Sequence, residues 1–126
     1  MIFGIGTDIV AVSRMTELWE RHGERSLEQL LAQEEREDCR CATSPGRFLA
    51  KRFAAKEALG KALGTGIRTP VSLNAIAIAH DAHGKPYFRF GPDLAAHLEQ
   101  RHLTAQLSIS DERDHAVAFV IVEQQP

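Results

Sequence analysis

The stretch from residue 47 to residue 66 reads RFLAKRFAAKEALGKALGTG, and the rest of the chain is best understood outward from it. It is dominated by Ala, Leu, Lys, Arg and Glu, which have the highest intrinsic helix propensities, so it predicts one long helix. Ser44 and Pro45 are favourable starting residues just ahead of it, and Gly64-Thr65-Gly66 supplies the stop.

The charges of this stretch are spread around the expected helix. At about 100° per residue, Arg52 and Lys56 fall near the apolar stripe, whereas Glu57 and Lys61 lie on the far side. A helix without a clean polar face is usually covered on several sides, and charges in such places need a partner or an anionic ligand. From spacing alone, a surface i, i+4 ion pair between Glu57 and Lys61 is the slightly favoured interpretation.

Composition limits the possible classes of protein. The chain has 126 residues, 44% hydrophobic and 25% charged, which is typical of one globular domain spanning residues 1–126. A net charge of −2 argues against a general nucleic-acid binder. No apolar run is long enough to span a membrane, and the N-terminal MIFGIGTDIV lacks the features of a signal peptide. We therefore expect a cytoplasmic protein that binds neither nucleic acid nor membrane.

The first segment, residues 2–10, predicts a strand with two different faces. One face carries Phe3, Ile5 and Ile9, and the other carries Gly4 and Gly6. Glycines in a strand mark a place where another backbone or a ligand comes close. Asp8 lies at the end of this cleared face, although it is also placed to cap the following helix.

The remaining segments predict short helices and antiparallel strands. Ser26 and Gln29 suggest a capping box for a short helix that continues to Leu31. The other expected elements are helices at 13–22, 33–41 and 92–102 and strands at 72–80, 87–90, 104–110 and 115–123. The last strand is apolar on both faces, so we expect it at the centre of a sheet. The predicted class is α+β, with a predominantly antiparallel sheet packed against one long helix and shorter helices.

A possible active site follows if the cleared strand face packs on the long helix. Asp8 would then approach Glu57, and Lys61 would lie one turn further along. Two neighbouring carboxylates repel unless a cation lies between them, and Mg²⁺ takes one or two carboxylates together with water and substrate phosphates. Lys61 would neutralise such phosphates, and Gly64 and Gly66 would let backbone amides approach them. This is the outline of a phosphoryl-transfer site.

Two separated motifs resemble a known family. GIGTDIV at 4–10 and RFAAKEALGKALGTG at 52–66 are similar to the short holo-(acyl-carrier-protein) synthases, which are 4′-phosphopantetheinyl transferases. The family pattern joins G-x-D, here Gly6-Thr7-Asp8, with F-x-x-K-E-A-x-x-K-A-x-G-T-G, here residues 53–66. The G-K-P at 84–86 and the apolar last strand also fit, so the resemblance covers essentially the whole chain and implies the 4′-phosphopantetheinyl transferase fold.

The resemblance implies a specific reaction. Such enzymes move phosphopantetheine from coenzyme A to a serine of apo acyl carrier protein, release adenosine 3′,5′-bisphosphate, and serve fatty acid biosynthesis. By position, Asp8 and Glu57 correspond to the Mg²⁺ ligands, and Lys61 to the lysine that neutralises the pyrophosphate. These three residues are the implied catalytic set, with Glu57 the most plausible base. The residues expected along the coenzyme are Arg52, Lys61, Gly64, Thr65 and Gly66.

The resemblance also implies partners. The family forms homotrimers with sites at subunit interfaces, and its first helix docks the acidic carrier protein, so Arg14 and Arg21 correspond to partner contacts. A solvated role for Arg21 stays open. One departure is Gln106, where many relatives have a histidine, so any acid–base role of that histidine does not carry over.

Two other interpretations remain open on the sequence. One is another Mg²⁺-dependent transferase that acts on a nucleotide-like substrate with a different acceptor. The other is an oligomeric binding module that holds an acidic partner on its basic helix, in which Glu57 only pairs with Lys61.

Overall fold

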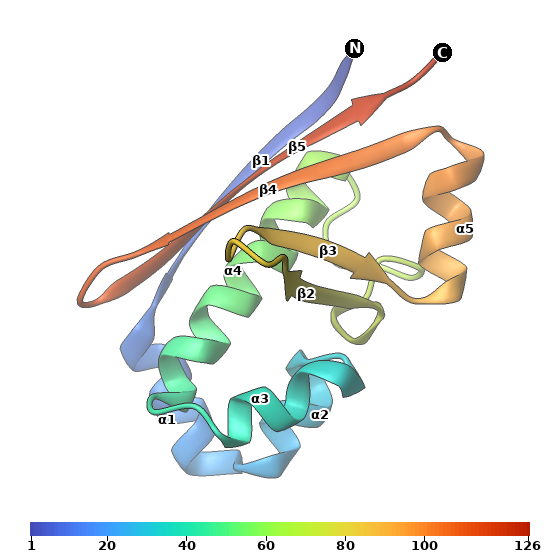
Figure 1. Ribbon diagram of the computed structural model, residues 1–126. Coiled ribbons are helices and arrows are strands. Elements are labelled where there is room, and N and C mark those ends of the chain that lie inside the picture. The colour runs from blue at the N-terminus through green and yellow to red at the C-terminus, as the bar shows by residue number, and fades with distance from the viewer.

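The computed structural model describes residues 1–126 and has the α+β organisation that the sequence predicts (Figure 1). The elements in chain order are β1 (Ile2–Ala11), α1 (Val12–His22), α2 (Glu24–Leu30), η1 (Gln33–Glu35), α3 (Arg36–Arg40), α4 (Pro45–Leu63), η2 (Leu73–Ala75), β2 (Ile76–His80), β3 (Pro86–Phe90), α5 (Pro92–Gln100), β4 (Leu103–Asp111) and β5 (His115–Gln124). None of these helices combines the length and the apolar character that crossing a membrane requires.

The strands form two antiparallel sheets. The larger sheet has the order β1-β5-β4, so the first and the last strand of the chain are neighbours, and β2 and β3 form a separate hairpin. Gly6 and Leu107 both lie opposite Val120, from the two sides of β5. The expectation that the last strand is central is therefore confirmed.

The long helix α4 crosses one face of the larger sheet (Figure 1). It begins as expected, because the Ser44 side chain accepts a hydrogen bond from the Arg47 backbone N–H at 3.3 Å and Pro45 occupies the first turn. It ends at Gly64, whose φ of 80° is left-handed. Its buried side includes Leu49 and Leu59, which anchor the core.

The glycines of β1 allow this strand to lie directly on the backbone of α4. A Cβ added at Gly4 would collide with the Ala62 carbonyl oxygen, and a Cβ at Gly6 with the Ala58 carbonyl oxygen. Only glycine permits such an approach. The packing of the cleared strand face on the long helix, which the sequence argument only assumed, is thus present in the structure.

Two local predictions differ from the structure. Helix α2 already begins at Glu24, directly after Gly23, and Ser26 lies inside it with its hydroxyl donating to the Leu18 carbonyl at 3.1 Å. The capping box at Ser26 was therefore wrong, because burial against α1 decides the role of this serine. The strand predicted at 72–80 starts only at Ile76, since residues 73–75 form a 3₁₀ turn whose Asn74 donates to the Leu31 carbonyl at 3.0 Å.

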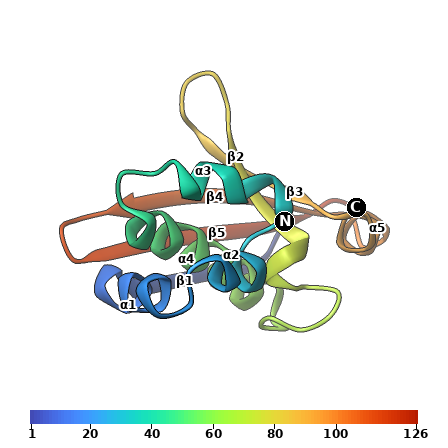
Figure 2. The same cartoon turned by 90° about the horizontal axis from the view of Figure 1, so that it is seen from below.

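The smaller elements frame α4. Helices α1, α2 and α3 gather near its first half, while α5 flanks the far end of β4 (Figures 1 and 2). The β2–β3 hairpin projects from the body, and its connecting loop stands clear of the other elements in Figure 2. Helix α4 therefore packs chiefly on β1 and β5 of the larger sheet and on α1, and it makes smaller contacts with α3 and with β2 of the hairpin.

Candidate active site

The outer charge cluster, defined as Asp8, Glu57 and Lys61, lies where β1 crosses α4. The Lys61 Nζ donates to the Asp8 Oδ1 at 3.0 Å and to the Thr7 carbonyl oxygen at 2.9 Å. The Asp8 side chain is 18% exposed and that of Lys61 is 54% exposed. Lys61 thus pairs with the strand: its ion-pair partner is Asp8, not Glu57.

Glu57 is a half-buried carboxylate that feels the charge of Asp8. Burial, followed by the neighbouring Asp8 carboxylate, raises the pKa of Glu57, while Lys61 and Arg14 act in the opposite direction. The alternative that Asp8 caps the next helix is wrong, because the cap of α1 is Ala11 and no side chain bonds there. The structure therefore brings together the three residues that the motifs singled out.

The two carboxylates of this cluster suit a hard cation that keeps several water molecules in its coordination shell. No group of three or more His, Cys, Asp or Glu side chains is arranged so that it could hold a metal ion by itself. Two carboxylates alone suit Mg²⁺, which commonly binds one or two carboxylates and completes its octahedron with water and substrate phosphates. Asp8 and Glu57 are the residues that can hold such an ion.

The glycine turn after α4 folds back on the end of the helix. Gly64 and Gly66 have φ of 80° and 66°, and the Gly66 N–H donates to the Gly60 carbonyl at 3.0 Å. A Cβ at Gly60 would lie 2.9 Å from the Gly66 carbonyl carbon, so position 60 has no room for a side chain. Position 66 favours glycine because of its positive φ. Thr65 is exposed at the tip of this turn, close in sequence to Lys61. The turn thus presents backbone beside the lysine.

Arg52 belongs to a second group, the inner charge cluster, which consists of Glu35, Arg52 and Lys56. The Arg52 Nη1 donates to the Glu35 Oε2 at 2.8 Å, and the Lys56 Nζ donates to the Glu35 Oε1 at 2.6 Å. Glu35 also accepts the backbone N–H groups of Ala32 and Ile78. Glu35 and Lys56 are 1% and 0% exposed, and burial lowers the pKa of Lys56 to about 8. Sequence reasoning missed Glu35, because nothing in the acidic run at 33–38 marks the residue that turns inward.

Arg52 also faces a basic cleft of about 400 Å³ on the side of α4 that is turned away from β1. The cleft is lined by Thr43, Ser44, Arg47, Phe48, Lys51, Arg52, His80 and Ile109. The Arg52 guanidinium stacks on Phe48 at 4.4 Å from the ring centre, and burial with the charges of Arg52 and Lys51 lowers the pKa of His80. Arg47 is held by Asp111 and two carbonyls at the β4–β5 turn.

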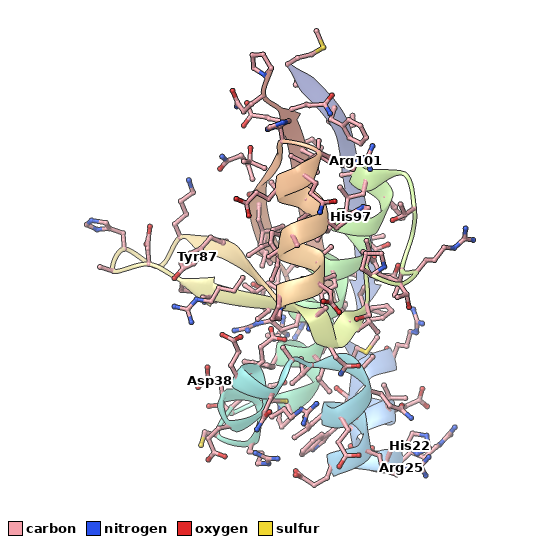
Figure 3. All side chains as sticks on the ribbon, turned by 90° about the vertical axis from the view of Figure 1, so that its right-hand side faces the viewer. His22, Arg25, Asp38, Tyr87, His97 and Arg101 are labelled. Carbon is pink, nitrogen blue, oxygen red and sulfur yellow. The ribbon has the colours of Figure 1, made fainter.

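The two arginines of the first helix are both exposed. The Arg14 guanidinium lies over the Phe53 ring at 5.5 Å from its centre, which ties α1 to the side of α4 that carries Glu57. Arg21 is in the last turn of α1, near the end of the molecule where Figure 3 shows His22 and Arg25. Gln106 is exposed on β4, and β5 separates it from Asp8 on β1.

Comparisons with known proteins agree on one group. The family model described as the 4′-phosphopantetheinyl transferase superfamily matches residues 4–120. A holo-[acyl-carrier-protein] synthase of Azoarcus sp. (strain BH72) is 56% identical over 123 residues, covering 98% of both chains. The crystal structure of a holo-[acyl-carrier-protein] synthase from Neisseria meningitidis superposes with a TM-score of 0.94 at 48% identity, covering 98% of this chain and 100% of the other. A Bacillus anthracis holo-(acyl-carrier-protein) synthase, solved in complex with CoA (3′,5′-ADP), has a TM-score of 0.81 at 35% identity and 99% coverage of both chains.

Proposed function

The chain belongs to the 4′-phosphopantetheinyl transferase superfamily, and we propose that it transfers 4′-phosphopantetheine from coenzyme A to a serine of apo acyl carrier protein. The observation that carries this proposal is the outer charge cluster, which combines the family's two motifs at one point of the fold. The coenzyme complex of the Bacillus anthracis relative supports coenzyme A as the donor.

The chemistry is a phosphoryl transfer with a serine acceptor. The serine oxygen forms a bond to the phosphorus that carries pantetheine, the bond to the bridging pyrophosphate oxygen breaks, and adenosine 3′,5′-bisphosphate leaves. Mg²⁺ held by Asp8 and Glu57 would neutralise charge on the pyrophosphate. Lys61 is placed beside Asp8 to hold the same phosphates, and the raised pKa of Glu57 suits it to accept the serine proton.

Binding of the long coenzyme would use groups on both sides of α4. The turn Gly64-Thr65-Gly66 presents backbone next to Lys61, where pyrophosphate oxygens would lie. Arg52 and its basic cleft supply positive charge at the other side of the helix. Within one subunit, helix α4 lies between the glycine turn and the basic cleft. One coenzyme could contact groups of both kinds if the turn of one subunit lay beside the cleft of a neighbouring subunit.

An exposed apolar surface supports assembly into the homotrimer expected for this family. The face of the larger sheet that is turned away from α4 exposes Phe3, Ile5, Ile9, Val117 and Phe119. A surface of this kind usually marks an interface. We propose that subunits meet through this face, which native mass spectrometry tests directly. A monomer at working concentration would contradict the trimer.

The proposed acceptor is an acidic carrier protein, and the exposed arginines of α1 could attract its negative charge. Arg14 lies beside the outer charge cluster and Arg21 further along the same helix. We expect both to contact the carrier. The proposed setting of the reaction is fatty acid biosynthesis in the cytoplasm.

Intact-mass spectrometry of apo acyl carrier protein, incubated with this protein, coenzyme A and Mg²⁺, tests the function. We expect a gain of one phosphopantetheine and formation of adenosine 3′,5′-bisphosphate, both lost in a parallel sample with chelator. No gain with several apo carriers would overturn the proposed function and favour a binding module.

A further inference from the structure

The ion pair between Lys61 and Asp8 is a contact of the outer charge cluster that the transfer chemistry itself does not require. The Lys61 ammonium is held between the Asp8 carboxylate at 3.0 Å and the Thr7 carbonyl oxygen at 2.9 Å. Both acceptors belong to β1, whereas the lysine belongs to the last turn of α4. The Asp8 carboxylate, one of the two proposed metal ligands, therefore already has a cation beside it.

A lysine and a divalent cation at one carboxylate oppose each other electrostatically. Like charges a few ångströms apart repel, and a charge near a ligand group weakens its attraction for a second cation. Glu57 is the other acidic group of the site and Arg14 of α1 the other cation that acts on it. Arg14 stacks on Phe53, so Lys61 is the cation in direct contact with Asp8.

The lysine is also free to leave. Its side chain is 54% exposed and ends a flexible stem, and ion pairs at such exposure contribute little to stability. An anion that arrives at the site would offer the ammonium a new partner at little energetic loss. In the proposed function, the pyrophosphate of coenzyme A would bring such an anion to the glycine turn beside Lys61.

We propose that Lys61 is a resident counter-cation of Asp8, which opposes divalent-cation binding until coenzyme A draws its ammonium away. This inference rests on the proposed function, because it takes coenzyme A as the anion. It makes metal and coenzyme binding mutually reinforcing: each raises the affinity of the other by the same factor. The site would then assemble fully only when both are present.

The test is a titration of the protein with Mn²⁺, followed through the electron paramagnetic resonance signal of the free ion, with and without saturating coenzyme A. The variants are Lys61→Gln and, as a control with the same change in net charge, Lys85→Gln on the exposed hairpin loop. We expect Lys61→Gln alone to bind Mn²⁺ about three- to fivefold more tightly than wild type, the size of one exposed charge pair. Lys85→Gln should match wild type.

Coenzyme A supplies the second readout. It should improve Mn²⁺ affinity more in wild type than in Lys61→Gln, because only wild type has a counter-cation to remove. Unchanged or weaker Mn²⁺ binding by Lys61→Gln without coenzyme would overturn the inference, even if wild type transfers phosphopantetheine. Absence of transfer by wild type would instead overturn the proposed function, while the Mn²⁺ affinities measured without coenzyme would still decide the role of Lys61.

Discussion

The inner and outer charge clusters share helix α4, and the adjacent residues Lys56 and Glu57 belong one to each. In the inner cluster, Glu35 accepts four hydrogen bonds and Lys56 donates three, and these two side chains are fully buried, so neither can bind a ligand; only Arg52 reaches the basic cleft. In the outer cluster, the Lys61 side chain is more than half exposed. Glu57 has no ion-pair partner there, and the nearby Asp8 carboxylate repels it. The comparison teaches that a binding site differs from a structural ion pair on the same helix less in its number of charges than in how many of its charged groups still lack hydrogen-bond partners within the protein.

The largest expected effect comes from breaking the inner charge cluster. Glu35→Gln leaves two cations in the protein interior without their carboxylate, which we expect to lower the free energy of unfolding by ~3–5 kcal/mol. Urea unfolding at fixed chain concentration measures this. The control is Glu34→Gln, the preceding residue, whose pair with Arg89 is exposed on both sides and should matter little. Equal stability of the two variants would contradict the structural role of Glu35.

The outer charge cluster should show the opposite pattern. Asp8→Asn and Glu57→Gln remove the proposed metal ligands, so we expect transfer to fall about 10²–10³-fold, equivalent to ~3–4 kcal/mol, with the stability of the protein kept. Mass spectrometry of the carrier gives the rate, and Asp38→Asn on exposed α3 is the control. Turnover at the wild-type level in either variant would refute the metal-site assignment.

The meeting of β1 and α4, on which the outer charge cluster depends, can be tested by adding one methyl group. In Gly6→Ala the new Cβ meets the Ala58 carbonyl, so strand and helix must separate. We expect a loss of ~1–3 kcal/mol in unfolding free energy together with reduced transfer. Gly91→Ala is the control, because its Cβ would find ordinary contacts of 3.7 Å at Ala75. Normal stability of Gly6→Ala would mean that the close approach is not tight.

The smallest effect on stability is expected at Lys61. Lys61→Gln removes an exposed ion pair, so the free energy of unfolding should change by less than ~1 kcal/mol. Urea unfolding beside Glu35→Gln places both clusters on one scale. A loss at Lys61 as large as that at Glu35 would erase the distinction between them.

The parts of the fold that local chemistry determines were predictable from the sequence. Ser44, Pro45 and Gly64 mark the bounds of α4, and the glycines of β1 indicate which strand face meets the helix. The convergence of Asp8 with α4 follows from that packing. The fold class and the central position of the last strand followed from the pattern of apolar residues, whereas the family was predicted from the resemblance of two motifs, at residues 4–10 and 52–66.

What remained hidden depends on tertiary burial. Glu35 reaches Arg52 and Lys56 from 17 and 21 positions away, and no periodicity in an acidic run selects it. Burial against α1 likewise gives Ser26 a partner other than the one that local capping rules predict. The roles of the site residues stay predictions until the experiments above are done.

The pairing of β1 with β5 has a consequence for how the chain acquires its structure. The Thr7 hydroxyl donates to the Ala118 carbonyl, which lies 111 positions later in the chain. During synthesis, β1 is therefore made long before its partner strand β5. Pairings of such high contact order are slow to form. Until β5 is made, β1 can pack only on the helices α1 and α4, with an apolar face and a free edge exposed. The interval before β5 emerges is therefore the period in which a nascent chain is most open to chaperones and to aggregation.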